Sequence, residues 1–257
     1  MMGPRILLTN DDGIHAPGLD VLRRIAAELS DDVWVVAPKG NQSGAGHRFT
    51  LGRELTLEQL APREFAVDGT PADCVVTGAT HVMGDRAPDV VLSGVNHGQN
   101  LGDIIHCSGT LAGAREGALH GAIGIALSQG VDYHFQQPVN WSSAEVHAAG
   151  LIRSLLAQGH NTEVYYNVNF PHCAASDVAG VELVPQQRFA QAAFRYYPSD
   201  NAGKFFVTIP ETPAPIEPGK DFHTLLETDT ITVTPLVLDH THAETISRLN
   251  GMLRLQR

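Results

Sequence analysis

The chain has 257 residues, with 17 lysines and arginines against 28 aspartates and glutamates, and a formal charge of −11 at pH 7. This length is enough to bury a substantial core in one large α/β domain or two small ones. The acidic balance argues against a general surface for nucleic-acid duplexes or anionic membranes, so a phosphorylated substrate would need help from a metal or from backbone N–H groups.

The first part of the chain predicts a strand, a helix and a second strand. Ile6–Thr9 is a short apolar strand, and residues 18–30 place apolar side chains at helical spacing. Residues 33–37 form a continuous apolar run, as expected for a strand buried on both faces, and Pro38 ends it. Short links between these elements indicate a βαβ unit with parallel strands and a right-handed crossover.

The middle of the chain continues the alternation of strands and helices. Residues 49–60 predict an outlying hairpin or strand pair, and Thr70 is a suitable N-cap for a helix that starts at Pro71 and runs to about residue 83. The remaining predicted elements are strands at 64–68, 89–93, 123–127 and 164–170, a long loop at 94–109, and helices at 110–120 and 142–158, the last capped by Ser142 or Ser143.

The pattern changes after about residue 171. The predicted elements there are short strands at 181–184, 189–197, 204–209 and 230–236, a proline-rich loop at 210–219 and a closing helix at 243–253. No repeat, low-complexity tract or linker divides the chain. We therefore expect one domain over residues 1–257, with a core of about 1–170 and a β-rich elaboration of about 171–257 that would form an oligomerisation arm.

The most unusual stretch follows the first strand. Asn10-Asp11-Asp12-Gly13 places two adjacent carboxylates beside a strand, although like charges repel each other. Either the pair holds a hard divalent cation, or it forms an ordinary Asx-type turn that Gly13 allows. This stretch alone favours neither interpretation.

Two later residues fall at equivalent places. Ser43 lies in the loop after the second strand, and Asn96 follows the predicted strand at 89–93. Because the carboxyl ends of parallel strands share one sheet edge, the fold would bring both residues to Asp11 and Asp12. Two carboxylates, a hydroxyl and an amide oxygen suit Mg²⁺ or Mn²⁺ rather than a structural zinc. Taken singly, Ser43 and Asn96 would more often be ordinary loop residues.

A fourth loop ends in Ser108-Gly109-Thr110 and opens a helix. A helix N-terminus offers unpaired N–H groups and a positive dipole end to an anion. Gly109 permits close approach and the two hydroxyls add donors, although Ser108 or Thr110 alone would more often be a simple helix cap. A cation beside such a site is what phosphoryl chemistry needs, because it neutralises phosphate charge and activates a bound water as the nucleophile.

Other phosphoryl-transfer motifs do not fit. Cys107 would need an arginine at the position of Gly113 to form a tyrosine-phosphatase loop, and residues 39–46 lack the Gly-Lys-Ser/Thr of a P-loop. Asp11 and Asp12 are adjacent, whereas a haloacid-dehalogenase phosphatase has Asp-x-Asp after its first strand.

The proton donor for such a reaction stays open. The chain has 13 histidines, of which His15, His97 and His106 lie in the candidate loops, where any could act as acid or base. Most of the histidines are expected to be solvated surface residues.

The cysteines and the N-terminus indicate the compartment. Three isolated cysteines, Cys74, Cys107 and Cys173, form no C-x-x-C pair, which is typical of a reduced protein. We find no signal-peptide pattern and no apolar run long enough to span a bilayer. We therefore expect a cytoplasmic protein without a membrane association.

Several motifs follow one another in a fixed order along the chain. They are TNDDG at 9–13 with PG at 17–18, VAP at 36–38 with NQSG at 41–44, DGTPADC at 68–74, SGVNHGQNLG at 93–102 and SGT at 108–110. Together they resemble the survival protein E (SurE) family. NVN at 167–169 and VTPL at 233–236 extend the resemblance over nearly the whole chain.

The resemblance implies a Rossmann-like, three-layer α/β/α fold and a metal-dependent nucleotidase. Such an enzyme hydrolyses nucleoside 5′-monophosphates, and in many members 3′-monophosphates, to nucleoside and phosphate. The implied ligands of one divalent cation (Mg²⁺ or Mn²⁺, with Co²⁺ as an alternative) are Asp11, Asp12, Ser43 and Asn96. The implied phosphate site comprises Asn96, Ser108, Gly109 and Thr110, and the implied catalytic residues are Asp11, Asp12, Ser108 and Thr110. The resemblance also implies a homodimer or homotetramer with exchanged C-terminal segments.

Two departures from the family pattern bear on substrate preference. His106-Cys107 stands where a tyrosine is expected, and residues 47–50 replace a serine-rich stretch. The preferred nucleotide and the physiological metal therefore stay open. The alternatives to a nucleotidase are an exopolyphosphatase or general phosphatase, and a non-catalytic nucleotide-binding sensor.

Overall fold

The structure of the protein is a computed structural model that describes residues 3–132, 138–159, 161–189, 194–208 and 215–252. Its centre is one large sheet built from strands of both halves of the chain. The strands of this sheet are β1 (Ile6–Thr9), β2 (Val33–Pro38), β3 (Leu57–Ala61), β4 (Glu64–Val67), β5 (Val90–His97), β6 (Ile123–Gln129), β7 (Val164–Phe170), β8 (Gly180–Leu183) and β11 (Thr230–Val237).

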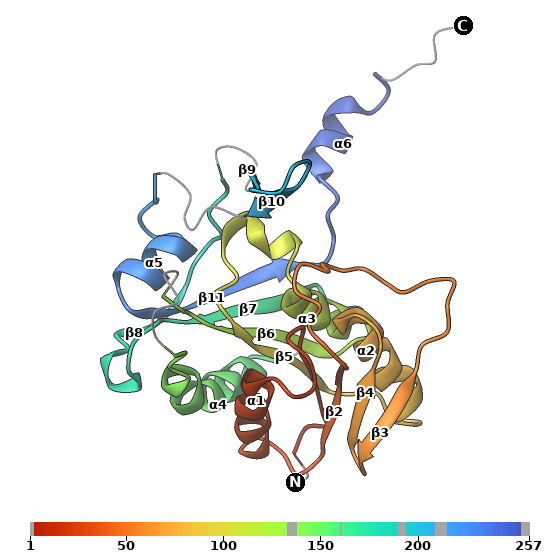
Figure 1. Cartoon of the computed structure of the whole chain (residues 1–257). Coiled ribbons are helices and arrows are strands. Elements are labelled where there is room, and N and C mark those ends of the chain that lie inside the picture. The colour runs from red at the N-terminus through yellow and green to blue at the C-terminus, as the bar shows by residue number, and fades with distance from the viewer. Residues whose placement is uncertain (1–2, 133–137, 160, 190–193, 209–214, 253–257) are drawn as a thin grey trace, which may run out of the picture.

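The strand order is β3-β4-β2-β1-β5-β6-β7-β11-β8, and the strands from β4 to β7 in this order all run parallel. β3 is antiparallel to β4, and β11 is antiparallel to β7. From β1 the chain builds the sheet outward through β2 and β4, then returns to place β5 on the other side of β1 (Figure 1). The strand order thus reverses between β1 and β5, and open α/β sheets bind ligands outside the carboxyl ends of strands at such a point.

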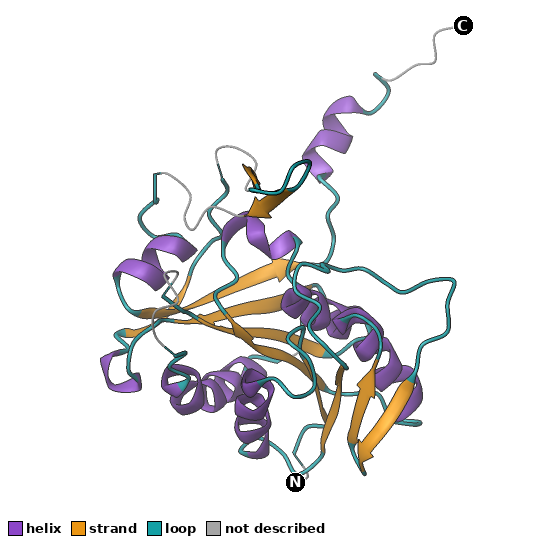
Figure 2. Cartoon of the chain, in the orientation of Figure 1, coloured by secondary structure: helices purple, strands orange, loops and turns teal. Residues whose placement is uncertain are grey.

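Helices cover both faces of the sheet, so the three-layer α/β/α fold expected from the sequence is confirmed (Figure 2). The helices that pack in pairs are α1 (Pro17–Ala27) with α4 (Ser142–Ala157) on one face, and α2 (Pro71–Thr77) with α3 (Gly109–Leu119) on the other. Side chains of β1 alternate between the faces, so Ile6 and Leu8 join the core under α1 and α4 while Leu7 joins the opposite core.

The C-terminal extension adds small elements around the sheet. β9 (Arg195–Pro198) and β10 (Phe205–Thr208) form a separate antiparallel pair, and α6 (Ala243–Leu249) stands away from the body of the molecule (Figure 1). The predicted segments at 189–197, 204–209, 210–219 and 243–253 each extend into residues outside the described part of the chain. Within the described residues, no helix has the length and apolar character that a membrane span requires.

The boundary of the strand predicted at 89–93 was wrong, and this error bears on the site. The strand predicted at 89–93 was expected to end at residue 93, but β5 continues to His97. Gly94 has a φ of 141°, and a Cβ there would lie 2.2 Å from the carbonyl oxygen of Leu127. The register with β6 shifts between Ser93 and Asn96. Gly94 therefore marks a bulge inside the strand rather than the start of a loop.

Three other local predictions differ from the structure. The Ser142 hydroxyl does not cap α4 but accepts from the backbone N–H of Ala175 at 3.2 Å, and Trp141 occupies the N-cap position without a side-chain cap. The hairpin expected within residues 49–60 forms further along, where β3 pairs with β4. The helix expected from residue 71 to about 83 is interrupted: α2 ends at Thr77 and a π-helical turn follows it.

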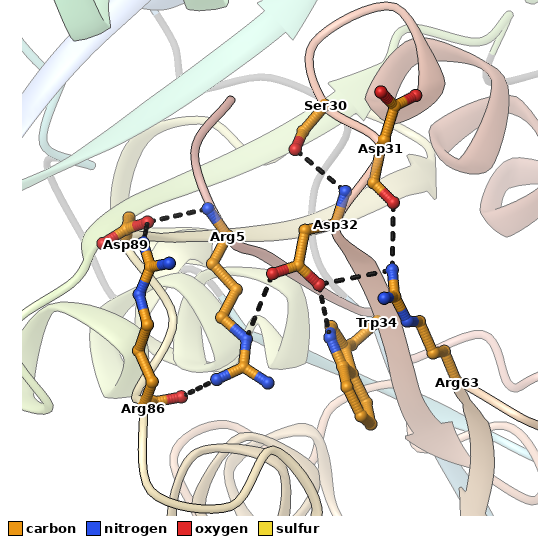
Figure 3. Close-up of polar contacts among 8 residues, drawn as sticks. All are labelled: Arg5, Ser30, Asp31, Asp32, Trp34, Arg63, Arg86 and Asp89. Carbon is orange, nitrogen blue, oxygen red and sulfur yellow. Dashed lines mark hydrogen bonds and ion pairs between the residues drawn. The ribbon is translucent and has the colours of Figure 1, made fainter. Parts of the chain in front are cut away.

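The amino ends of the central strands carry a network of charged side chains (Figure 3). The Asp32 carboxylate lies 3.4 Å from Arg5 and 3.3 Å from Arg63, and it accepts from the indole N–H of Trp34 at 2.9 Å. Both guanidinium groups lie over the Trp34 ring, at 5.2 and 5.4 Å from its centroid. Asp89 accepts from the Arg5 backbone and pairs with Arg86 at 2.6 Å. This edge of the sheet is thus closed by contacts within the chain.

Candidate active site at the carboxyl edge of the sheet

The turn after β1 is closed by Asn10, not by the two carboxylates. Asn10 is buried; its amide nitrogen donates to the carbonyl of Gly13 at 2.9 Å, and its amide oxygen accepts the Gly13 N–H at 3.2 Å. Gly13 has a φ of 107°, which favours glycine. An Asx-type turn is therefore present, but it leaves the side chains of Asp11 and Asp12 for other contacts.

Asp11 faces α3. Its buried carboxylate accepts the Thr110 hydroxyl at 2.6 Å, and a Cβ on Gly109 would lie 2.7 Å from the Asp11 Cβ. Burial raises the pKa of Asp11 to about 6; the Thr110 hydrogen bond opposes this shift and the charge of Asp12 adds to it. Gly109 thus gives Asp11 the room to lie against the first turn of the helix.

Asp12 is half-buried and lines a cavity on the other side of the turn. Its carboxylate accepts the backbone N–H of His97 at 3.2 Å, at the end of β5. Burial raises the pKa of Asp12, and the His97 N–H and the charge of the His97 ring oppose the shift. Among the described residues, no lysine or arginine forms an ion pair with Asp11 or Asp12. Two desolvated, neighbouring carboxylates without a lysine or arginine partner among the described residues fit a divalent cation, which would favour their ionised forms.

Ser43 lies in an exposed loop that two backbone hydrogen bonds attach to the site. The N–H of Gln42 donates to the carbonyl of Asp11 at 2.7 Å, and the N–H of Gly46 donates to the carbonyl of Cys107 at 3.0 Å. The loop after β2 is therefore attached both to the carboxylate turn and to the residue that precedes Ser108. The fold brings these three segments together, as the sequence predicted.

Asn96 lies on β5 itself, one residue before His97. Its amide nitrogen donates to the carbonyl of Gly98 at 2.7 Å, which leaves the amide oxygen as a candidate cation ligand. The neighbouring backbone is packed tightly, since a Cβ on Gly18 would lie 1.9 Å from the carbonyl oxygen of Val95. Gly18 thereby lets the start of α1 approach β5 beside the site.

The predicted phosphate loop forms the start of α3. Ser108 is the N-cap residue, and its Oγ accepts the N–H of Leu111 at 3.2 Å. Thr110 is fully buried and donates its hydroxyl to Asp11. The two hydroxyls were predicted to act alike but are placed differently. Ser108 lies at the N-cap of α3, whereas Thr110 donates to the Asp11 carboxylate and orients it.

Sequence reasoning missed Glu116, which anchors the Ser43 loop. Glu116 is buried on α3 and lies 2.7 Å from Nε2 of His47 and 3.1 Å from Nε2 of His120. His47 follows Ser43 in the loop, so this contact fixes the loop against the helix. The only signal in the sequence is a lone glutamate within an alanine- and glycine-rich helix.

Two acidic residues attach the C-terminal extension to the segment before Ser108, and neither was predicted. Asp221 is buried at the start of the unpredicted helix α5 (Asp221–Glu227) and accepts the N–H groups of Gly102 and Gln187 at 2.7 and 2.8 Å. Burial raises the pKa of Asp221, and its backbone hydrogen bonds oppose the shift. Asp103 pairs with Arg188 at 2.6 Å.

The cavity beside Asp12 has a volume of about 620 Å³. Its lining comes from four separated segments: the turn before α1, the end of β2, the end of β5 and the residues before α4. The lining residues are Asp12, Gly13, His15, Ala16, Pro17, Gly18, Lys39, Gly40, His97, Pro138, Val139 and Trp141. Only the folded chain brings these segments together, so no pattern in the sequence indicates the cavity.

These features define a class of protein. It is a Rossmann-like α/β protein whose candidate ligand site combines a carboxylate pair with a helix N-terminus at the point where the strand order reverses.

Comparison with known proteins identifies the family within that class. A family profile described as "Survival protein SurE" matches residues 6–193. A protein of Brucella anthropi named "5′-nucleotidase SurE" is 46% identical over 252 residues, covering 97% of each chain. One of Methylorubrum populi with the same name is 44% identical over 253 residues, covering 97% of this chain and 99% of that one. The crystal structure of the SurE protein from Aquifex aeolicus matches with a TM-score of 0.84 and 32% identity, over 97% of this chain and 99% of the other. The chain therefore belongs to the survival protein SurE family.

Proposed function

We propose that this protein is a divalent-metal-dependent 5′-nucleotidase that hydrolyses nucleoside 5′-monophosphates, and also 3′-monophosphates, to nucleoside and phosphate. The observation that carries the proposal is the pair Asp11 and Asp12, which are desolvated, have no lysine or arginine partner among the described residues, and lie beside the N-terminus of α3. The names of the relatives from Brucella anthropi and Methylorubrum populi support the same activity.

The donor set fits a hard cation. Asp11, Asp12, Ser43 and Asn96 would hold one Mg²⁺ or Mn²⁺, and Co²⁺ would also be accepted, because all four donors are oxygens. The bound cation would offset the negative charge of the phosphoryl group and supply an activated water.

The chain's own groups prepare the site for a phosphoryl group. Thr110 holds the Asp11 carboxylate in one orientation through its hydroxyl. The N-terminus of α3 presents the positive end of its helix dipole to phosphate oxygens, and Ser108, whose Oγ accepts from Leu111, still has its hydroxyl proton to donate. These donors would stabilise charge that grows on the phosphoryl oxygens in the transition state.

The test is phosphate release from AMP with Mn²⁺, with and without a chelator, extended to 3′-AMP and short polyphosphate. We expect turnover that the chelator abolishes and that added Mn²⁺ or Mg²⁺ restores. Nucleotide binding without chelator-sensitive turnover would instead favour a sensor, and a preference for polyphosphate would favour an exopolyphosphatase.

We also propose that the enzyme works in the cytoplasm as a homodimer or homotetramer. Aromatic side chains on β9 and β10 support a subunit contact, since Tyr196, Tyr197, Phe205 and Phe206 are each at least half exposed. Light scattering of the purified chain would test this proposal, and a monomer at micromolar concentration would contradict it.

A further inference from the structure

We propose that the cavity beside Asp12 receives the nucleoside of the substrate, and that the indole ring of Trp141 is the surface on which the base stacks. This inference rests on the proposed function, because it assigns the place of the leaving group in the same reaction. It adds a specificity-determining residue that the family motifs in the sequence do not contain.

The two carboxylates divide the site into two sides. Asp11 contacts Gly109 and Thr110 at the start of α3, whereas Asp12 lines the cavity, whose walls include the first residues of α1 and the residues that precede α4. α3 lies on one face of the sheet, and α1 and α4 lie on the other (Figure 1). A phosphate whose free oxygens meet the N-terminus of α3 must direct its ester oxygen away from that helix. The cavity on the Asp12 side is the space into which the rest of the substrate would then extend.

The cavity has the size and lining that a nucleoside requires. Its volume of about 620 Å³ lies within the range of roughly 300–1,000 Å³ found for small-molecule sites. Its walls combine apolar surface from Pro17, Val139 and Trp141 with polar groups from His15 and His97. A nucleoside likewise has an apolar-faced base and a polar sugar, so the two surfaces are complementary.

Trp141 is held in place before any ligand arrives. Its ring is half-buried and packs against the core under α1 and α4. A Cβ on Gly18 would lie 3.1 Å from Cη2 of the Trp141 ring, so the glycine leaves the space that the indole occupies. A ring fixed on one side and open to a cavity on the other is the arrangement used for stacking bases.

The charge of the cavity favours a neutral group over a second phosphate. Among the described residues that line it, Lys39 is the only lysine or arginine, and it pairs with Glu58 at 2.9 Å. Asp12 adds a negative charge at one end. A base and its sugar are uncharged, so they can occupy this cavity while the phosphate remains at the carboxylates.

The first test measures binding without catalysis. The chain has two tryptophans, and Trp34 lies at the opposite edge of the sheet, so Trp34→Phe leaves Trp141 as the only indole reporter. Adenosine titrated into this variant without metal should change its fluorescence saturably, and adenosine should inhibit AMP hydrolysis competitively. The absence of a saturable change would overturn the proposal, whatever the enzyme's activity.

The second test measures discrimination between substrates with and without a base. We expect Trp141→Ala to lower the ratio of kcat/KM for AMP to that for ribose 5-phosphate by about 10-fold or more, since stacking is lost. Trp141→Phe, which keeps an aromatic ring and the packing, should keep most of the ratio. Val146→Ala, on the exposed surface of α4, is the matched control.

The two tests separate the inference from the proposed function. If the ratio stays unchanged in Trp141→Ala and Trp141→Phe alike, the base does not stack on this ring and the inference is wrong. If the unaltered protein hydrolyses neither phosphomonoester, the proposed function fails, and the adenosine titration alone decides whether the cavity binds a nucleoside.

Discussion

The two edges of the sheet use the same residue type for opposite purposes. At the amino edge, Asp32 lies between the guanidinium groups of Arg5 and Arg63 and accepts from Trp34 (Figure 3). At the carboxyl edge, Asp11 accepts the Thr110 hydroxyl and Asp12 accepts the His97 N–H, and no lysine or arginine among the described residues pairs with either carboxylate. A carboxylate that pairs with arginines of the same chain holds structural elements together. A carboxylate without a lysine or arginine partner is available to a ligand.

This difference predicts that the amino edge contributes to stability and the carboxyl edge to activity. Ion pairs of partly exposed side chains contribute at most about 1 kcal/mol each. Changes at the amino edge should therefore lower stability slightly and leave activity intact, while changes at the carboxyl edge should do the reverse.

The largest expected effect is that of Asp12→Asn. The amide still accepts the His97 N–H but loses the charge that a cation needs, so we expect kcat/KM for AMP to fall at least about 100-fold with the fold retained. Asp32→Asn is the matched control at the other edge and should keep kcat within about 2-fold. Phosphate release and circular dichroism measure both variants. Equal losses of activity in the two variants would remove the distinction between the edges.

The second effect is the pH dependence of stability that Asp11 introduces. Its pKa in the folded protein, about 6, exceeds the ordinary 3.8, so the folded state holds the proton more tightly than the unfolded chain does. The contribution of Asp11 is therefore fully present below 3.8 and is lost as the pH rises to about 6.

Asp11→Asn cannot titrate, so it isolates this contribution. In the presence of a chelator, the free energy of unfolding of the unaltered protein should fall by up to about 3 kcal/mol relative to Asp11→Asn between about pH 4 and 6.5. Urea unfolding at a series of pH values measures the difference, and added Mn²⁺ should restore stability at the upper end. A constant difference across this range would show that Asp11 is not desolvated.

A smaller effect should follow from the contact that orients Asp11. Thr110→Val keeps the shape of the buried side chain but removes the hydroxyl that donates to the carboxylate. We expect the Mn²⁺ concentration for half-maximal activity to rise about 10- to 100-fold, as for other residues that support metal ligands. Thr110→Ser retains the donor and should stay close to the unaltered protein. Similar losses in the two variants would point to packing rather than to the hydrogen bond.

The smallest expected effect is that of the loop anchor. Glu116→Gln weakens the contacts with His47 and His120 and should loosen the loop that carries Ser43. Because Ser43 is one of several expected ligands, we expect the Mn²⁺ concentration for half-maximal activity to rise by no more than about 10-fold. Glu145→Gln, which loses a surface pair with Arg24, is the control and should not change it.

The fold and the carboxylate turn were predictable because their signals are local. A buried apolar strand followed by Asn10-Asp11-Asp12-Gly13 is a continuous stretch, and parallel strands necessarily end at one edge. The position of Asn96 was harder, because Gly94 looks like the start of a loop but marks a bulge within β5.

Other features depend on contacts between distant segments and could not be read from the sequence. Asp221, in a helix of only 7 residues, accepts the N–H of Gly102, which lies 119 residues earlier in the chain. Thr110 was predicted from its place at the helix start, but no local pattern shows that its hydroxyl is buried and donates to Asp11. The position of Trp141 beside Asp12 follows from the packing of α4 against α1, which no local pattern reveals.

We expect Asp11 and Asp12, at the carboxyl edge, to hold a divalent cation. Titration of Mn²⁺, followed by calorimetry and by the electron paramagnetic resonance of free Mn²⁺, tests it without any substrate. We predict one tight site per chain in the unaltered protein and in Asp32→Asn, and no such site in Asp12→Asn. One tight site retained in Asp12→Asn would contradict the claim.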